Sequence, residues 1–316
     1  MNIQENIPLA PYTTFKIGGP ARFFCEAKSE EKILEALKFA REKNLSVFVL
    51  GGGSNVLVSD KGFDGLVIKI KLSAWRLYLH DGDSISILTC DAGCVLSKIV
   101  SESVKAGLTG LEWAAGIPGT IGGAVRGNAG ARALGGEMAD AVESVKVLDV
   151  DDLQIKTYDL RMCEYEYRNS VFKQNSNLII LSAKLKLKKG DKAASEKKIQ
   201  EILTKRKEKQ PMEFPSPGSF FKNPLVKDKK LIQQFETDTG QKIRDDKIPA
   251  PWLIEEAGLK GQKNGGAMVS EKHANFIVNT GKATAEDVIT LAAIIKTKVR
   301  NKFGIQLQEE VQMVGF

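Results

Sequence analysis

A glycine-rich segment at residues 116–130 constrains the fold more strongly than any other part of the chain. It reads GIPGTIGGAVRGNAG and contains six glycines and one proline, a composition that argues against an ordinary helix or strand. Because glycine permits positive φ and has no Cβ, successive N–H groups can point into one concavity and hold an anion. We interpret the segment as a cradle for a diphosphate. A glycine-rich connection without a ligand is the alternative for a single run of this kind.

A second glycine run strengthens that interpretation. Residues 51–55 read GGGSN and directly follow the apolar segment 46–50. A strand that ends in three glycines, a serine and an asparagine presents several donors at one point. Two such runs indicate a long ligand. Since neither matches the dinucleotide fingerprint or the P-loop, a different nucleotide-binding fold is expected.

Length and composition narrow the class of protein. The chain has 316 residues, of which 42% are hydrophobic and 27% charged, as in a globular protein of two or three domains. No apolar run approaches the ~20 residues that span a bilayer, and the N-terminus does not resemble a signal segment, so a cytosolic protein is expected. The net charge of +7 fits an anionic partner. The basic residues are not interleaved with aromatics, so nucleic acid is not expected as partner. No membrane partner is expected either, and no obligate protein partner is evident.

The titratable residues point to chemistry supplied by a cofactor. The four cysteines form no CxxC motif, and the chain has only two histidines, His80 and His273. Disulfides, a metal site and a histidine relay are therefore not expected. A carrier such as a flavin would supply the redox chemistry, and the protein would bind and orient it.

Hydrophobic periodicity predicts three units, at residues 1–71, 72–203 and 204–316. The first has strands at 21–27, 46–50 and 66–70, with a helix from the N-cap Ser29 to about Lys43. The second has strands at 84–91, 142–150 and 178–187, a helix at 95–105 and a polar helix at 192–207. The third has a proline-rich loop at 213–224, helices at 230–237 and 251–257, a helix from the Thr284–Asp287 capping box to about Asn301, and a final strand at 305–314.

Seven motifs fall in one order along the chain: TTFKIGGPA (13–21), GGGSNVL (51–57), GIPGTIGGA (116–124), NAGA (128–131), YRNSVFK (167–173), GSFFKNP (218–224) and VSEKHANFIVN (269–279). Together they resemble the UDP-N-acetylenolpyruvoylglucosamine reductase family from Thr13 to the final strand. The short interval between Tyr167 and Gly218 resembles the compact branch of that family, which lacks an added substrate loop. Seven collinear motifs are far more specific than any one of them.

The resemblance implies a fold, two cofactors and a reaction. The fold would be α+β, with a two-subdomain FAD-binding region of the vanillyl-alcohol-oxidase-like type followed by a C-terminal α+β substrate-binding domain that closes over the substrate. NADPH would reduce the flavin at N5, and the reduced flavin would pass hydride to C3 of UDP-N-acetylglucosamine enolpyruvate in the synthesis of peptidoglycan precursors. Neither histidine falls in a glycine motif, so non-covalent FAD is expected. The cofactor-binding residues would be Gly51, Gly52, Gly53, Ser54, Asn55, Gly116, Pro118, Gly119, Thr120, Gly122, Gly123, Asn128, Ala129 and Gly130.

Three residues match the family's catalytic positions. Arg168 would hold the substrate carboxylate and stabilise the enolate; the alternative is a surface arginine paired with Glu164 or Glu166. Ser219 would deliver a proton to C2; the alternative is a turn serine.

Glu310 would sit against the developing carboxylate charge, protonated or sharing a proton; the alternative is an exposed strand carboxylate. Strand periodicity alone does not choose between Glu309 and Glu310, and resemblance to the family's final motif selects Glu310. Four further residues are substrate-binding candidates: Tyr167, Lys209, Lys222 and Asn223. This chain departs from the usual pattern at Pro217 and around Glu310, at Gln308, Glu309 and Gln312.

Two other functions fit parts of the sequence. A flavin-linked oxidase of the same fold would share both glycine runs but would not need a serine proton donor. A basic protein that binds nucleotide or nucleic acid would account for the charge and would carry no flavin.

Overall fold

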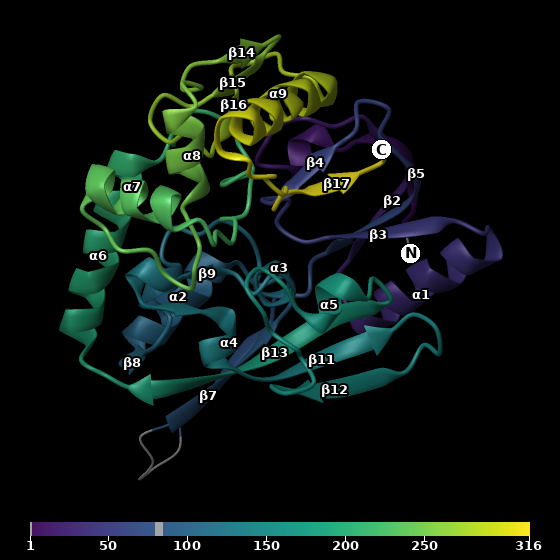
Figure 1. Cartoon of the computed structure of the whole chain (residues 1–316). Coiled ribbons are helices and arrows are strands. Elements are labelled where there is room, and N and C mark those ends of the chain that lie inside the picture. The colour runs from purple at the N-terminus through teal and green to yellow at the C-terminus, as the bar shows by residue number, and fades with distance from the viewer. Residues whose placement is uncertain (1, 80–84) are drawn as a thin grey trace. The chain divides into compact units, whose positions relative to one another are not determined.

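The computed structural model describes residues 2–79 and 85–316 (Figure 1). The chain folds into two compact units. Unit 1 consists of residues up to 7 together with 21–52 and 64–208, and unit 2 consists of 8–20, 53–63 and 209–316. Two short N-terminal segments therefore belong to the same unit as the C-terminal third of the chain. The division into three parts at 71/72 and 203/204 stays a prediction.

The first sheet of unit 1 has the strand order β1-β2-β5-β3. Its strands are β1 (Gln4–Pro8), β2 (Pro20–Ala27), β3 (Ser46–Leu50) and β5 (Phe63–Ile70), and the helix α1 (Glu30–Glu42) connects β2 to β3. Ser29 caps α1 by accepting a hydrogen bond from the Lys32 amide, and the apolar face of α1 is buried. Strands β3 and β5 are parallel.

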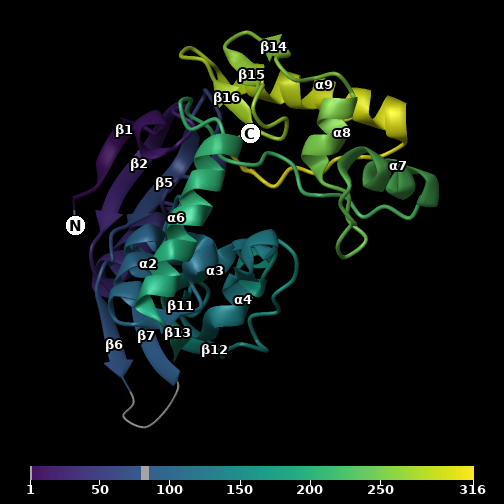
Figure 2. The same ribbon diagram turned by 90° about the vertical axis from the view of Figure 1, so that its left-hand side faces the viewer.

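The second sheet of unit 1 is antiparallel, and Figure 2 shows its strands side by side. The order is β12 (Ile155–Asp159), β11 (Val142–Asp149), β13 (Leu178–Lys189), β7 (Ile85–Asp91) and β6 (Trp75–Leu79), with β8 (Leu108–Thr109) also paired to β13. Burial alternates along β7, which confirms the predicted strand over 85–91. Ser84 and His80 lie outside the described residues.

Helices and short elements complete unit 1. The helices are α2 (Leu96–Lys105), α3 (Ile121–Arg126), α4 (Met138–Ala141), α5 (Val171–Gln174) and α6 (Lys192–Lys209). The short elements are η2 (Glu112–Ala114), η3 (Arg132–Leu134), β9 (Gly130–Ala131) and β10 (Gly136–Glu137). The expectation that 116–130 contains no helix is wrong for α3. Its glycines permit close packing on the residues that follow β7, because a Cβ on Gly122 would lie 2.8 Å from the Ala92 Cβ.

Unit 2 surrounds a second hydrophobic core. It contains η1 (Ala10–Tyr12), α7 (Lys229–Thr239), α8 (Ala250–Glu256), α9 (Ala285–Phe303) and the sheet β14 (Lys263–Asn264), β15 (Ala267–Val269) and β16 (Ile277–Asn279). Strand β4 (Val56–Val58) pairs in parallel with β17 (Gln312–Val314), as Figure 1 shows. Among the described residues, no helix has the length and apolar character needed to cross a membrane.

The predicted final strand at 305–314 is wrong over most of its length, because regular pairing is confined to β17. The segment before β17 pairs with a different partner: the Lys222 amide donates to the Gln308 carbonyl at 2.9 Å, and the Glu310 amide donates to the Phe220 carbonyl at 2.8 Å. The chain bends at Val311 and then joins β4. The change of partner interrupts the strand, which a pattern of alternating apolar residues cannot reveal.

The N-terminus of α9 is capped from two places in the sequence. The predicted capping box is confirmed, since the Asp287 amide donates to the Thr284 hydroxyl at 3.0 Å and the Thr284 amide donates to the Asp287 carboxylate at 3.1 Å. In addition, Asp60 accepts hydrogen bonds from the amides of Ala285 at 2.9 Å and Glu286 at 3.1 Å. A carboxylate at this end also interacts favourably with the helix dipole.

We expect Asp60→Ala to lower the free energy of unfolding by about 1–2 kcal/mol, because two helix amides lose a charged acceptor. Asp64→Ala is the matched control: Asp64 pairs with Arg22 at 3.1 Å, but its side chain is 85% exposed, so a change near zero is expected. Urea unfolding of the full chain measures both variants. Equal stabilities would contradict a capping role for Asp60.

Candidate functional site

The two glycine runs meet within unit 1. A Cβ on Gly52 would lie 2.6 Å from the Gly119 Cα and 3.3 Å from the Thr120 amide nitrogen. A Cβ on Gly51 would lie 2.8 Å from the Thr120 hydroxyl. Real Cβ atoms do not approach backbone this closely, so Gly52 requires glycine, whereas a side chain at Gly51 would meet the Thr120 side chain. The structure thus brings together two segments that the sequence predicts at one ligand.

The amides of the second run are not all available to a ligand. The Ile121 amide donates to the Cys94 carbonyl at 2.9 Å, and the Gly122 amide donates to the Ala92 carbonyl at 2.8 Å. The expectation that successive amides in this run point into one concavity is therefore wrong for these two residues. Their hydrogen bonds attach the N-terminus of α3 to the residues that follow β7.

Thr120 provides a polar group at the same place. The residue is only 8% exposed, and its hydroxyl has no hydrogen-bond partner among the described residues. A buried hydroxyl without a partner is costly, and such groups are typical of ligand sites. Since this hydroxyl faces the position of the Gly51 Cβ, it fits an acceptor atom of a cofactor bound against Gly51.

Arg206 on α6 lies beside the start of the second run. Gly116 has a φ of +75°, and a Cβ there would lie 2.9 Å from the Arg206 Cδ. Within the described part of the chain, the buried Arg206 Nε has no hydrogen-bond partner, and burial lowers the pKa of the guanidinium. A desolvated guanidinium of this kind suits an anion. Sequence reasoning missed Arg206, because it lies in a polar helix whose pattern indicates a solvated connector.

Arg168 is held against the backbone of another predicted segment. It has a φ of +57°, and its guanidinium donates to the carbonyls of Gly130 at 2.9 Å and Asn128 at 3.5 Å. The Asn128 side chain is buried and donates to the Glu137 carboxylate at 3.2 Å. Hydrogen bonds from Arg132 are the main reason that the pKa of Glu137 is lowered, and Asn128 and the charge of Arg168 contribute further. The predicted residues Arg168, Asn128 and Gly130 therefore lie together in unit 1.

Tyr167 neighbours Arg168, whose Cζ lies 5.5 Å from the centre of the tyrosine ring. Both side chains are half-buried. A guanidinium over an aromatic ring can form a cation–π contact and keeps its hydrogen-bonding plane.

Ser219 lies in unit 2 on a loop that is anchored on both sides. Gly218 before it has a φ of +87°, and Phe220 and Phe221 after it are fully buried. Asn275 holds this loop: its side-chain oxygen accepts from the Phe221 amide at 3.0 Å, and its side-chain NH₂ donates to the Phe221 carbonyl at 2.8 Å. Sequence reasoning missed Asn275, since its contact lies more than fifty residues away in the chain.

Glu310 lies on the segment that pairs with the serine loop. Its amide donates to the Phe220 carbonyl at 2.8 Å, and its carbonyl accepts from the Asn55 side chain at 3.3 Å. The Gln312 amide donates to the Asn55 carbonyl at 3.0 Å. Asn55, which the sequence predicts at the cofactor, thus binds the backbone of the predicted carboxylate residue.

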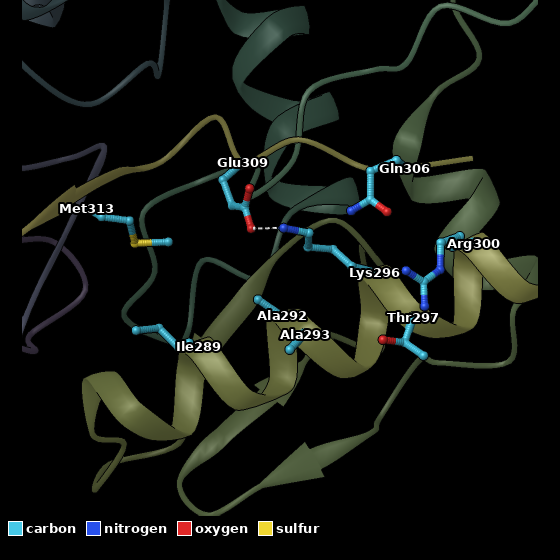
Figure 3. A pocket seen from close by; sticks show the side chains of 9 residues that line it. All are labelled: Ile289, Ala292, Ala293, Lys296, Thr297, Arg300, Gln306, Glu309 and Met313. Carbon is cyan, nitrogen blue, oxygen red and sulfur yellow. Dashed lines mark hydrogen bonds and ion pairs between the residues drawn. The ribbon is translucent and has the colours of Figure 1, made fainter. Parts of the chain in front are cut away.

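The neighbouring carboxylate, Glu309, is directed elsewhere. It forms an ion pair with Lys296 of α9 at 2.8 Å, next to a cavity of about 290 Å³ between α9 and the C-terminal segment (Figure 3). Successive side chains of an extended segment point to opposite sides. Glu310 is therefore expected to point away from Lys296, and its assignment as the catalytic carboxylate stays a prediction.

The other predicted residues occupy varied positions. Asn223 accepts a hydrogen bond from the Ala250 amide at 2.9 Å, Lys222 is half-buried, and Lys209 at the end of α6 is exposed. His273 packs on Phe276 with ring centres 4.7 Å apart, and burial lowers its pKa. Among the residues that the structure describes, no group of three His, Cys, Asp or Glu could hold a metal ion.

Two family models match the chain. The model "FAD binding domain" matches residues 21–157, and the model "UDP-N-acetylenolpyruvoylglucosamine reductase, C-terminal domain" matches residues 210–314. Together they confirm the predicted α+β fold class, an FAD-binding region followed by a C-terminal domain.

Relatives match over nearly the whole length. The UDP-N-acetylenolpyruvoylglucosamine reductase of Carboxydothermus hydrogenoformans is 41% identical over 99% of this chain and 94% of its own. That of Solibacter usitatus is 38% identical over 99% of this chain and 97% of its own. The solved structure of UDP-N-acetylenolpyruvylglucosamine reductase from Thermus caldophilus matches with a TM-score of 0.75 and 33% identity, over 99% of both chains.

We expect Thr120→Val to leave the apoprotein as stable as the parent or slightly more stable, because an unsatisfied buried hydroxyl is removed. Affinity for FAD should fall about tenfold, since a hydrogen bond to the cofactor is lost. Thr120→Ser retains the hydroxyl and is the matched control. Thermal unfolding of the apoproteins and titration with FAD, followed by flavin fluorescence, measure both effects. Equal FAD affinities for all three proteins would remove Thr120 from the cofactor site.

Proposed function

The chain belongs to the UDP-N-acetylenolpyruvoylglucosamine reductase family, and we propose that it reduces UDP-N-acetylglucosamine enolpyruvate to UDP-N-acetylmuramate with NADPH as the electron donor. The names of the relatives and the FAD-binding domain support an FAD-dependent oxidoreductase. The observation that carries the finer proposal is the backbone pairing between the serine loop and the segment of Glu310. It brings a hydroxyl-bearing and a carboxylate-bearing segment into direct contact. We further propose that the enzyme acts in the cytoplasm, in the synthesis of peptidoglycan precursors.

We assign the cofactor to the glycine runs of unit 1 without a covalent link. Gly51, Gly52 and Gly119 let backbone approach the diphosphate, and the Thr120 hydroxyl supplies a donor. Arg206 supplies positive charge beside Gly116. When bound, the flavin would accept two electrons from NADPH and deliver them to C3 of the substrate.

Arg168 would bind the carboxylate of the enolpyruvyl group. Its guanidinium is oriented by the Gly130 carbonyl at 2.9 Å and by the Tyr167 ring. As electrons reach C3, negative charge develops on this carboxylate as an enolate. A planar, permanently charged guanidinium stabilises such charge better than a point charge does.

Ser219 would donate the proton that C2 requires. Its hydroxyl is a weak acid, but an enolate carbon is strongly basic, so position matters more than acidity. The loop provides this position, because Phe220 is fully buried and its amide donates to the Asn275 carbonyl at 2.8 Å.

Glu310 would stand against the same developing charge and share a proton with it. Its backbone is held by Phe220 and Asn55, so the carboxyl group is positioned relative to the serine loop. The remaining assignments to the sugar and nucleotide are Tyr167, Lys209, Lys222 and Asn223, of which the two lysines suit a diphosphate.

Anaerobic absorbance spectroscopy tests the function as a whole. The purified protein should be yellow, NADPH should bleach it, and UDP-N-acetylglucosamine enolpyruvate should restore the oxidised spectrum without oxygen. Bleaching without recovery would require another acceptor and would favour the oxidase alternative. A colourless protein that binds no added FAD would overturn the proposal at its first step.

Ser219→Ala should leave bleaching by NADPH unchanged and slow reoxidation by the substrate by about 10²–10⁴-fold, because the proton donor is lost. Ser216→Ala, three residues earlier in the same loop, is the matched control and should reoxidise within a few fold of the parent. Stopped-flow absorbance separates the two half-reactions. A Ser219→Ala enzyme that reoxidises at the parental rate would exclude the proton-donor role.

Arg168→Lys should also slow the second half-reaction, by about 10²-fold, although the positive charge is retained, because the planar fork is lost. Arg132→Lys is the control: Arg132 pairs with Glu137 but has a 55% exposed side chain. Stopped-flow absorbance measures the rate of the second half-reaction in both variants. Parental kinetics in Arg168→Lys would show that only charge is required there.

A further inference from the structure

A lysine that the proposed mechanism does not use lies against the first glycine run. Lys69 is on β5, where it is in register with Leu50 at the end of β3. Its ammonium group donates a hydrogen bond to the carbonyl of Gly51. The ammonium group of Lys69 therefore lies at Gly51, the first residue of the glycine run that follows β3.

The sheet places Lys69 on the face away from α1. Leu66, Ile68 and Ile70 are buried in the core that includes the apolar residues of α1. Because side chains alternate along a strand, Lys69 points to the other face. It is half-buried there, and lysine is a residue that proteins rarely bury unless it is paired.

The charged groups around Lys69 do not neutralise it. Strand β3 carries no titratable side chain. On β2, Glu26 pairs with Lys71 at 3.5 Å, while Arg22 pairs with Asp64 at the other end of β5. In the part of the chain that the structure describes, no carboxylate lies within ion-pair distance of Lys69. Burial is the main reason that its pKa is lowered to about 8; Lys71 lowers it further and Glu26 opposes the shift.

We propose that Lys69 is a further cofactor-binding residue, which holds the Gly51 carbonyl and adds a positive charge to the site of the flavin diphosphate. The inference rests on the proposed function, since it needs FAD at the glycine runs. Lys69 and the Thr120 hydroxyl both meet Gly51, one through its carbonyl and the other beside its Cα. An anion bound against Gly51 would therefore experience a hydroxyl donor and an ammonium charge at one residue.

This arrangement makes cofactor affinity depend on pH in one direction. A bound diphosphate stabilises the ammonium form, so the pKa of Lys69 in the complex lies above its value of about 8 in the free protein. Binding then takes up a proton between these two values. Affinity is fully present below the lower value and declines as the pH rises through it.

The test compares FAD binding by full-length apoproteins of the parent, Lys69→Arg and Lys69→Met between pH 6.5 and 9.5, with flavin fluorescence as the readout. The parent's Kd should rise several-fold from pH 7 to pH 9. Lys69→Arg should bind tightly with little pH dependence, because a guanidinium stays charged. Lys69→Met should bind about tenfold more weakly at pH 7 and should not vary with pH.

Lys71→Met is the matched control, because Lys71 lies two residues away and is paired with Glu26. It should retain the affinity of the parent at pH 7, and its decline in affinity should move to higher pH, because the charge of Lys71 lowers the pKa of Lys69. Thermal unfolding of each apoprotein checks folding, and Lys69→Gln replaces Lys69→Met if the latter does not fold.

Two results would overturn the inference: parental affinity and pH dependence in Lys69→Met, or equal loss in the arginine and methionine variants. Because no enolpyruvyl substrate is involved, the result is separable from the proposed function. The expected pattern together with failed substrate reduction would leave Lys69 at the flavin and refute the reaction. Absence of FAD binding in the parent would refute both.

Discussion

The candidate cofactor site of unit 1 depends on direct backbone contact between its two glycine runs, with no side chain between them. At Gly52 and Gly119 the chain approaches itself so closely that a single Cβ would lie 2.6 Å from an α-carbon. Any other residue at Gly52 would push the two loops apart, and the hydroxyl of Thr120 and the ammonium of Lys69 would no longer meet the same residue. The site therefore depends on the absence of a Cβ at Gly52 and Gly119. This close contact places the surrounding polar groups.

Unit 2 positions its chemical groups in a different way. Ser219 and Glu310 lie on irregular backbone, yet each is tied to a neighbour that is rigid: Phe220 and Phe221 are buried, and Asn275 satisfies both polar groups of the Phe221 backbone. Irregular backbone that is fully hydrogen-bonded and anchored in a core can hold a side chain as precisely as a strand does. The ion pair between Lys296 and Glu309 connects this segment to α9. Glu310, the next residue, does not take part in that ion pair.

The sequence predicted the parts of this structure whose causes are local. The Ser29 cap, the Thr284–Asp287 box and the alternating strand at 85–91 depend on residues within one turn or one strand, and all three are confirmed. The final strand was predicted too long, because its pairing partner changes after Glu310, and α3 was missed, because its glycines indicate a loop unless a neighbouring strand is known. Arg206 and Lys69 lie in none of the motifs, and the motif that contains Asn275 does not reveal its contact. Their role follows only from the distant residues that they contact.

The pairing of β4 with β17 has a consequence for how the protein reaches its native state. The two strands lie at opposite ends of the sequence, yet they form one parallel ladder from Val56 to Val58 and from Gln312 to Val314. Synthesis proceeds from the N-terminus, so β4 exists long before its partner and presents an unpaired edge in the meantime. Closing so long a loop is slow, since the entropy is lost before the contacts form. The ladder can therefore form only after residues 312–314 have been synthesised, and until then the edge of β4 has no partner from β17.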